Sequence, residues 1–386
     1  MEYKKVALSE AVEEMFIGPF GSSLKNECFV DKEQAYCMVY EQKHAIKKTM
    51  NVETRYVDER KYKELQRFNV KGGDIIVSCR GTIGETFVVP EDAPLGIMHP
   101  SIMKIRLKDG VYDKYYFNCL LKMRLKKHET EANGSGIKMA ISATELGKEL
   151  FPVPSLEEQE QIKQTLLRIE TLISTRTEEL KLLDELIKAR FVELFDGKGY
   201  PEITIGELAA SKVSSVKKVF APTDTIKYID ISSIDNKRNV MTGYTEYVLE
   251  EAPSRAQQHI KKGDIVVSTV RPNLKNVAIT DYEYDNLVAS SGFCVLRAEK
   301  CLPAYLMAVV CSNDFTDAMT KVVTGANYPA IKDSDVRNYV IPNPPIEVQE
   351  QFAAFVEQTD KSKVAVQKAL DEAQLLFDSL MQEYFG

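Results

Sequence analysis

The sequence GDIIVS at residues 73–78 returns almost unchanged as GDIVVS at residues 263–268. A PxP and a QEQ anchor also occur twice, at 152–154 and 159–161 and again, with the same offset, at 342–344 and 349–351. The sequence between these anchors differs strongly between the copies. The offset between the two copies, from residue 73 to residue 263, is the size of a domain. It far exceeds the roughly 20 to 50 residues of solenoid repeats. The repeat therefore indicates one architectural unit that is used twice.

The composition is ordinary for a protein long enough to form two domains. The chain has 386 residues, 44% of them hydrophobic, and it lacks the run of about 18 apolar residues that a membrane span requires. The first residues show no apolar signal-peptide region, so we expect a cytoplasmic protein with no membrane partner. The seven cysteines form no C-x-x-C pair and have no histidines at zinc spacing, so we expect free thiols and no metal site.

The net charge of −7 is unevenly distributed along the chain. Residues 154–197 hold 6 Lys and Arg against 10 Asp and Glu, and residues 344–386 hold 3 against 8. The remaining segments, 1–153 and 198–343, therefore have a net charge of +2. Because the positive charge lies outside the two acidic segments, the overall acidity does not exclude a nucleic-acid partner.

Each acidic segment carries apolar residues at steps of three and four, which is the pattern of a heptad seam on a long helix. Neither Pro nor Gly interrupts 155–196 or 346–385, and Gly197 stands where a helix would end. At ~1.5 Å per residue, about 35 helical residues span roughly 50 Å. The predicted seam positions are Ile162, Leu166, Ile169, Ile173, Leu180, Leu183, Ile187, Phe352, Val356, Val366, Leu370 and Phe377.

The two seams fall in the same phase, with the same offset as the other repeated anchors. Packing onto its own domain would be the simplest explanation for either helix alone. A short globular block cannot cover so long a seam, however, so we expect the two helices to form an antiparallel coiled coil. Since each helix follows its own block, this pairing predicts a dumbbell in which a rigid spacer separates the blocks.

The blocks themselves have the pattern of mixed α/β domains, so the predicted fold class is an α/β (α+β) tandem repeat. Helices are expected near 113–128 and 303–323. Strands are expected where β-branched residues cluster between turn residues, at 74–78, 85–89, 102–107, 225–231, 264–269 and 292–296. The strand order does not follow from these patterns.

Candidate catalytic motifs have better structural explanations. Asn343-Pro344-Pro345-Ile346 is similar to the base-gripping loop of adenine N6-methyltransferases, but Ile346 cannot stack on an extruded base. No glycine-rich turn for S-adenosylmethionine precedes it, and a proline-stiffened helix start accounts for the prolines. The four histidines are scattered, and no zinc-protease, serine-hydrolase or Walker motif occurs. We therefore expect no catalytic residues.

Basic and amide side chains follow corresponding strands of the two blocks. Arg and Asn make paired hydrogen bonds to base edges, whereas Lys mainly contacts phosphates. Any one of these residues alone is more typical of a solvated surface, but their occurrence at equivalent loops of both blocks favours nucleic-acid binding. The candidates are Arg80, Thr82, Lys126, Lys127, Lys138, Arg271, Asn273, Lys275, Asn327 and Tyr328.

Over essentially its whole length the chain resembles a specificity (S) subunit of a type I restriction-modification system. The resemblance rests on the repeated GDI-[IV]-V-S strand, on VRPNLKN at 270–276, and on the two block ends, FPVPSLEEQ at 151–159 and IPNPPIEVQ at 341–349. In the second block, Glu347-Val348 departs from the usual Glu-Glu pair.

The resemblance implies target-recognition domains at 1–153 and 198–343 and conserved spacer helices at 154–197 and 344–386. Each domain would read one half of a split sequence in double-stranded DNA, and the helices would act as a ruler. Two methyltransferase subunits would dock and would hold S-adenosylmethionine, so this chain itself needs no cofactor. Restriction subunits can join such a complex. Because the blocks differ in sequence, the two half-sites should differ as well.

Two other functions remain open from the residues. A coiled-coil adaptor with duplicated heads and no DNA role predicts weak, salt-insensitive DNA binding. A single-chain methyltransferase or nuclease predicts that the isolated chain binds S-adenosylmethionine.

Overall fold

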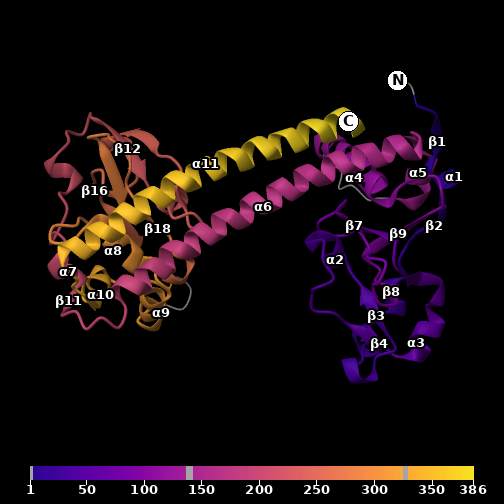
Figure 1. The fold of residues 1–386 in the computed structure, drawn as a ribbon, viewed down its shortest axis with the longest axis horizontal. Coiled ribbons are helices and arrows are strands. Elements are labelled where there is room, and N and C mark those ends of the chain that lie inside the picture. The colour runs from indigo at the N-terminus through magenta and orange to yellow at the C-terminus, as the bar shows by residue number, and fades with distance from the viewer. Residues whose placement is uncertain (1–2, 136–141, 325–328) are drawn as a thin grey trace. The chain divides into compact units, whose positions relative to one another are not determined.

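The computed structural model describes residues 3–135, 142–324 and 329–386, and the chain divides into two compact units (Figure 1). Unit 1 comprises Met1–Arg176 together with Ala369–Gly386, and unit 2 comprises Thr177–Lys368. The long helices α6 (Leu156–Phe195) and α11 (Ile346–Phe385) both contribute residues to both units. Each unit thus contains one globular block, the start of one long helix and the end of the other.

Two four-stranded sheets form the globular block of unit 1. The first is antiparallel throughout, in the order β2 (Val12–Ile17), β9 (Ile102–Leu107), β6 (Ile75–Ser78) and β7 (Thr86–Val88). The second has the order β4 (Tyr56–Val57), β3 (Cys37–Tyr40), β8 (Gly96–Met98) and β5 (Asn69–Val70). In the second sheet β3 and β8 run parallel and the other pairs antiparallel. The block is therefore a mixed α/β domain.

Unit 2 repeats this arrangement of strands, except that its first sheet has three strands and no counterpart of β2 among the described residues. Its first sheet has the order β18 (Val277–Ile279), β17 (Ile265–Ser268) and β20 (Phe293–Leu296). Its second has the order β15 (Thr245–Val248), β12 (Thr225–Ile229), β19 (Leu287–Ser290) and β16 (Ala256–His259). The central pair β12 and β19 is again parallel and its neighbours antiparallel. The predicted α/β tandem repeat is confirmed.

The repeated GDI-[IV]-V-S sequence forms an inner strand of the first sheet in each unit, β6 in unit 1 and β17 in unit 2. All four residues of β6 and of β17 are buried, which explains why these strands read as continuous apolar runs rather than as alternating patterns. Each of the predicted strands corresponds to a strand of the structure, with ends that differ by up to two residues. The parallel pairing of β3 with β8 was not predicted, because it joins segments that are far apart in the sequence.

Helices and short strand pairs complete each unit. The predicted helix at 113–128 is α4 (Lys114–Ser135), which ends seven residues later than predicted. The predicted helix at 303–323 is divided into α8 (Pro303–Val310) and α9 (Asn313–Lys321), where the Ser312 hydroxyl accepts from the Phe315 N–H. The remaining elements are β1 (Lys5–Ala7) with β10 (Leu150–Pro152), β11 (Glu202–Thr204) with β21 (Val340–Pro342), β13 (Ile234–Asp235) with β14 (Val240–Met241), α1 (Leu8–Ala11), α2 (Gln42–Lys47), α3 (Glu59–Glu64), α5 (Ala143–Lys148), α7 (Ile205–Leu208) and α10 (Asp333–Arg337).

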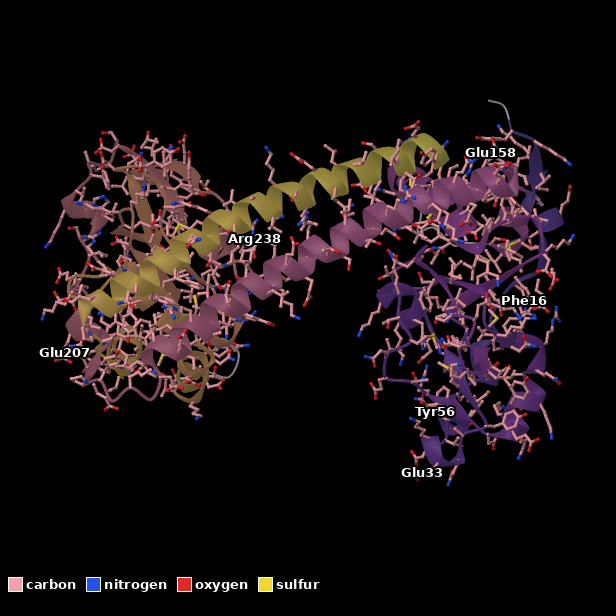
Figure 2. All side chains as sticks on the ribbon, in the orientation of Figure 1. Phe16, Glu33, Tyr56, Glu158, Glu207 and Arg238 are labelled. Atoms are coloured by element: carbon pink, nitrogen blue, oxygen red, sulfur yellow. The ribbon has the colours of Figure 1, made fainter. Side chains whose placement is uncertain are left out.

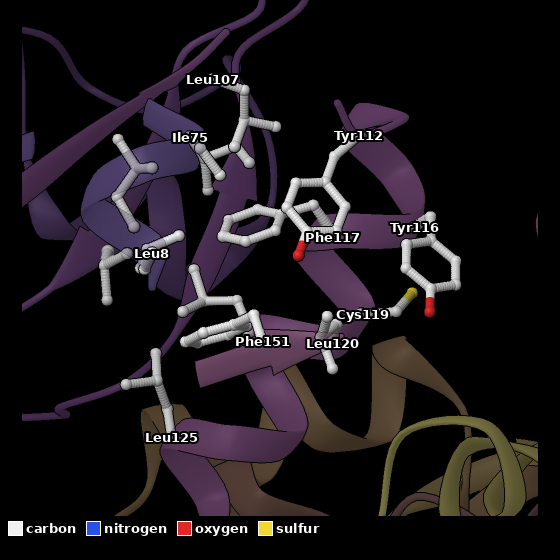
Figure 3. Close-up of a cluster of buried hydrophobic side chains, with 14 of the residues drawn as sticks. Leu8, Ile75, Leu107, Tyr112, Tyr116, Phe117, Cys119, Leu120, Leu125 and Phe151 are labelled. Carbon is white, nitrogen blue, oxygen red and sulfur yellow. The ribbon is translucent and has the colours of Figure 1, made fainter. Parts of the chain in front are cut away.

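The largest core of unit 1 lies where the first sheet, α4 and the long helices meet. Phe117 and Phe151, whose ring centroids are 5.9 Å apart, sit at its centre together with Leu120 (Figure 3). Phe385 at the end of α11 packs against Tyr116, with 5.1 Å between ring centroids. In unit 2 Phe195 at the end of α6 packs in the same way against Tyr305, at 4.8 Å.

The long helices run antiparallel. In unit 1 Ile162 and Leu166 near the start of α6 share a core with residues near the end of α11. In unit 2 the end of α6 shares a core with Phe352 near the start of α11, and Lys363 pairs with Asp184 at 2.6 Å. All of the predicted seam positions are buried or half-buried. By contrast, the exposed large apolar residues of these helices lie elsewhere, at Leu156, Leu172, Leu182, Leu186, Val192, Ile346, Val364, Leu375 and Leu376.

A buried glutamine joins the start of each long helix to its own block. Gln159 accepts from the Asp113 N–H at 2.8 Å and donates to the carbonyls of Pro154 and Val111. Gln349 accepts from the Leu302 N–H at 2.9 Å and donates to the Pro344 carbonyl. The first glutamine of each QEQ sequence therefore holds the start of the long helix against its own block.

The caps of the two helices differ. Ser155 and Glu158 form a capping box at the start of α6 (Figure 2). The short helix α7 begins with the same kind of cap, formed by Thr204 and Glu207. At the start of α11 the equivalent positions are Pro345 and Val348. Val348 therefore stands where Glu158 completes the capping box, and the capping serine is absent as well. Pro345 occupies the position of Ser155, and a proline is favourable at the start of a helix.

All seven cysteines are free. No helix within the described residues combines the length and the apolar character that crossing a membrane requires.

Candidate nucleic-acid interface

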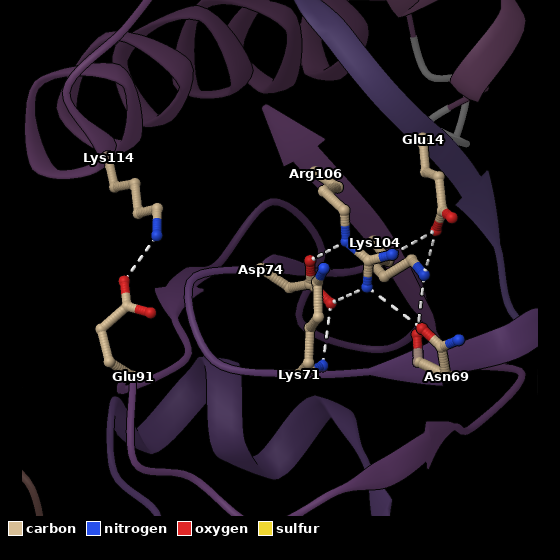
Figure 4. A network of polar contacts seen from close by, with 8 residues as sticks. All are labelled: Glu14, Asn69, Lys71, Asp74, Glu91, Lys104, Arg106 and Lys114. Atoms are coloured by element: carbon tan, nitrogen blue, oxygen red, sulfur yellow. Dashed lines mark hydrogen bonds and ion pairs between the residues drawn. The ribbon is translucent and has the colours of Figure 1, made fainter. Parts of the chain in front are cut away.

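The aspartate of the repeated motif supports the strand that leads to each candidate loop. Asp74 accepts two hydrogen bonds from Arg106, both at 2.7 Å, and one from the Lys71 N–H (Figure 4). Asp264 accepts the same set from Arg297, at 2.8 and 2.6 Å, and from the Lys261 N–H. Such paired Arg–carboxylate bonds fix both partners in direction. The motif thus builds the scaffold of each block and does not itself form the interface.

The glycine before each aspartate has a left-handed backbone, with φ of +80° at Gly73 and +86° at Gly263. A residue with a Cβ would be strained there, so the turn into the strand requires glycine.

The serine that ends each strand holds the base of a loop. In unit 1 the Ser78 hydroxyl accepts from the Glu85 N–H at 3.0 Å, which closes the 79–84 loop. In unit 2 the Ser268 N–H donates to the Asn276 carbonyl at 2.9 Å, which closes the 269–275 loop. Both serines are buried, whereas the loop residues Arg80 and Arg271 are exposed. Each loop is therefore an exposed arch on a rigid strand.

In unit 1 the structure brings the 79–84 loop next to α4. A Cβ at Gly84 would lie 3.6 Å from the Leu125 Cβ, so the loop end rests on this helix. The neighbouring Lys126 and Lys127 are exposed, as are Arg80 and Thr82. Four of the predicted contact residues thus belong to two adjoining elements. Lys138 lies outside the described residues.

A further basic segment of this region was not predicted. It is α2, whose Gln42 lies 3.8 Å from the position of a Gly81 Cβ and whose cap Lys48 pairs with Glu85 at 3.4 Å. Burial, and then the positive charge of Lys48, lower the pKa of Lys122 on α4. The charge of Glu85 acts in the opposite direction and raises the pKa of Lys122, so this cluster of two lysines includes one carboxylate. Lys43, Lys47 and Lys48 are close in sequence, which could have suggested the patch, but nothing in the sequence places it beside the loop.

In unit 2 the 271–275 loop is unusually strained. Arg271 and Lys275 flank a 3-10 turn, and both have left-handed backbones, with φ of 50° and 52°. This conformation costs about 1–2 kcal/mol for a residue with a side chain. Arg271 and Asn273 are exposed, whereas the Lys275 ammonium donates to Asn313 at 2.6 Å. Lys275 therefore supports the loop through α9, and Arg271 and Asn273 are its exposed polar side chains.

The second predicted loop of unit 2 adjoins the first at its ends. Ala330 forms isolated bridges with both Val270 and Thr324, and the Arg271 N–H donates to the Pro329 carbonyl at 2.8 Å. The candidates Asn327 and Tyr328 lie outside the described residues.

A family model for the type I restriction modification DNA specificity domain matches residues 28–184 and again residues 198–373. This chain belongs to that family. Each match covers most or all of one globular block and most of the long helix that follows it, so the internal repeat of the sequence is a repeat of the family's domain.

The curated relatives share this family. The chain is 24% identical over 337 residues to the type I restriction enzyme MjaVIII specificity subunit of Methanocaldococcus jannaschii, which covers 78% of this chain and 77% of the relative. It is 21% identical over 357 residues to the MjaIX specificity subunit of the same organism, covering 85% and 80%. A shorter match, 26% identical over 144 residues, covers 35% of this chain and 31% of the HindI specificity subunit of Haemophilus influenzae.

Solved structures show the same fold along the whole chain. The S subunit of a type I restriction-modification system from M. genitalium aligns with a TM-score of 0.55 and 14% identity, covering 100% of this chain and 96% of the other. A chain from a structural study of assembly and conformational transition of the type I R-M system aligns with a TM-score of 0.58 and 15% identity, covering 99% and 97%. Specificity-domain folds can thus be maintained by very different sequences.

Proposed function

We propose that this chain is the DNA-specificity subunit of a type I restriction-modification complex and that it reads an asymmetric, bipartite target. In this proposal residues 1–153 and 198–343 each recognise one half-site. The observation that carries the proposal is that the corresponding buried strand of each unit, β6 or β17, leads into a loop with an exposed arginine. These arginines are Arg80 and Arg271. Because the two arches differ in sequence around this arginine, the two half-sites should differ as well.

We further propose that the long helices, residues 154–197 and 344–386, dock partner proteins. Their exposed apolar side chains support this, since Val364 is 71% exposed and Leu375 69%. Exposed apolar surface of this kind, among charged residues, is typical of protein–protein contact. The expected partners are two methyltransferase subunits, to which restriction subunits can be added. Their acidic surroundings would repel DNA phosphates, which suits a protein partner better than the duplex.

Catalysis in this proposal belongs to the partners, and S-adenosylmethionine is expected in the methyltransferase subunits. The thiols of this chain support the assignment. Burial raises the pKa of Cys79 to about 11, and it raises that of Cys301 to about 11 as well. Both groups are therefore protonated near neutral pH, when a nucleophilic cysteine would be a thiolate.

The proposal is tested by single-molecule methylation sequencing of host DNA with and without the gene. We expect one bipartite, asymmetric N6-methyladenine motif to disappear on deletion. An unchanged methylome, with the gene shown to be expressed, would contradict the proposal and would favour a coiled-coil adaptor without a DNA role.

A further inference from the structure

A short hairpin occupies in unit 2 the place that α2 occupies in unit 1. In each unit the segment follows the first strand of the parallel pair in the second sheet. This strand is β3 in unit 1 and β12 in unit 2. The hairpin consists of β13 and β14, joined by residues 236–239, which we call the hairpin tip. Its inner side chains Ile234 and Met241 are buried in a core with Val266 and Ala278. The hairpin base is therefore fixed to the first sheet.

The hairpin tip is bound directly to the 271–275 loop. The Asn236 amide donates to the Leu274 carbonyl at 2.8 Å. The Asn239 amide donates to the carbonyls of Lys275 at 3.2 Å and Val277 at 3.1 Å. Two side-chain hydrogen bonds thus join the hairpin tip to the loop, and a third joins it to Val277 at the start of β18, so that tip and loop form one surface.

Backbone strain is concentrated at this junction. Of the four described non-glycine residues with left-handed backbones, three are Asn239, Arg271 and Lys275. Strained backbones of this kind persist where the surrounding structure holds them, and they cluster at binding sites. Here the asparagine bonds and the buried hairpin base supply that support.

Three of the exposed side chains of this surface are cationic, those of Lys237, Arg238 and Arg271. The N–H groups of Lys237 and Arg238 donate to the Asp235 carboxylate, at 2.9 and 3.2 Å, so the backbone of the tip is held in place (Arg238 is labelled in Figure 2). Within the described residues, none of the side chains of Lys237, Arg238 and Arg271 has a carboxylate partner. In the same unit, by contrast, Arg297 and Arg337 are paired with aspartates.

We propose that the hairpin tip and the 271–275 loop form a single DNA-reading surface, in which Arg238 and Arg271 contact base edges and Lys237 contacts a phosphate. This inference rests on the proposed function and adds a second reading element to unit 2. An arginine fork matches the paired acceptors of guanine in the major groove, which is wide enough for a two-stranded ribbon. A reading side chain must be held by rigid neighbours, and the three asparagine bonds supply that rigidity.

The test compares methylomes of hosts that carry the wild-type gene or the variants R238A, R238K, N239G and K262A. Lys262 is a matched control, because it is an exposed cation at the opposite end of β17. We expect R238A to relax base preference at one position of one half-site by about 5- to 150-fold, with the other half-site unchanged. R238K keeps the positive charge but lacks the forked guanidinium group. It should therefore relax the same position, but reduce the amount of methylation less than R238A does.

N239G tests the junction, because glycine accepts the left-handed backbone and removes both amide bonds. We expect it to broaden the sequence of the same half-site only, and K262A to leave the motif unchanged. The melting temperature of each purified variant is measured as well. A value equal to that of the wild type would exclude a general loss of stability.

A motif that is identical for wild type and R238A would overturn the inference. So would a uniform loss of methylation without relaxation at any base, since that result assigns Arg238 to phosphate alone. These outcomes are distinct from failure of the proposed function, in which the wild-type gene itself directs no motif.

Discussion

At the scale of single residues, the buried Lys104 shows where the two units depart from one another. Its ammonium donates to Glu14 at 2.5 Å and to the Asn69 carbonyl at 2.7 Å, and it lies over the Phe16 ring (Figure 4). In the strand pairing of unit 2 the equivalent position is the buried Val295. An apolar residue is therefore compatible with this position of the fold.

We predict that Lys104→Met is tolerated and that Glu14→Gln is not. Lys104→Met removes the ammonium together with its desolvation cost, and the partner Glu14 is partly exposed and keeps its contact with Arg106 at 3.1 Å. No charge is therefore left both buried and unpaired, and the free energy of unfolding should change by less than about 1 kcal/mol. Glu14→Gln leaves the buried ammonium without its carboxylate and should cost about 2–3 kcal/mol, allowing for the partial exposure of Glu14. Urea unfolding followed by circular dichroism measures both. A larger loss for Lys104→Met than for Glu14→Gln would contradict the prediction.

A second residue-scale prediction concerns acid stability. Burial alone would raise the pKa of Glu41, but hydrogen bonds and charges from Arg55 and Lys43 hold it below its usual range. A carboxylate with a lowered pKa stabilises the fold above its unfolded value, near 4.5, and this contribution is lost as the pH falls through the folded pKa. Glu41→Gln should therefore lower the stability by about 2 kcal/mol at pH 7, and the difference should narrow below pH ~4.5.

Melting temperatures between pH 7 and pH 3.5 measure this difference. Glu283→Gln is the control, because that exposed glutamate makes its ion pair with Lys262 on the surface of unit 2. A deficit for Glu41→Gln that stays constant with pH would show that the lost packing, and not the charge, is responsible.

Single residues also mark the limit of what the sequence predicts about the interface. Arg80 and Arg271 could be identified because each directly follows a repeated strand. The role of Asp74 and Asp264 could not be identified, since their partners lie more than 30 residues further along the chain: Arg106 is on β9, and Arg297 directly follows β20. Asn239 was missed for the same reason, because its partner Lys275 belongs to a different loop.

At the scale of elements, the long helices were predictable because apolar periodicity over 40 residues is a strong local signal. Short elements give no such signal. The strands β13 and β14 have two residues each, too few for any period to show, and their tip could not be distinguished from an ordinary turn. The hairpin tip of the candidate interface is thus a part that the sequence alone does not reveal.

The buried glutamines yield a prediction about how each helix is joined to its block. Gln159→Ala removes the acceptor of the Asp113 N–H and the donor to two carbonyls, and Gln349→Ala removes the acceptor of the Leu302 N–H and the donor to one carbonyl. Each substitution should cost about 2–4 kcal/mol. Each substitution should increase hydrogen exchange in its own block and in the start of its own helix. Gln164→Ala is the control, since this exposed residue of α6 bonds to Glu160 on the same helix. Equal effects of Gln159→Ala and Gln164→Ala would refute the role of the buried glutamine.

At the scale of the whole molecule, each unit depends on both repeats. The core of unit 1 includes Phe385 from the end of α11, and the core of unit 2 includes Phe195 from the end of α6. Neither repeat taken alone therefore contains a complete unit. This exchange of helix ends makes the two long helices obligatory partners, so that a change in the length of one requires the same change in the other.

That requirement leads to the test of the ruler. Removing one heptad from each helix, residues 170–176 and 371–377, keeps the seam in phase and shortens each helix by about 10 Å. If the helices set the separation of the DNA-reading surfaces, the unread spacer of the target should shorten by about three base pairs, at ~3.4 Å each, while both half-sites stay the same. Methylation sequencing of a host that carries the shortened gene reads spacer and half-sites together. Because the deletions touch no loop of either block, an altered half-site would point to a change inside a unit. An unchanged spacer would show that DNA bending or another part of the complex, and not the helices, fixes the distance.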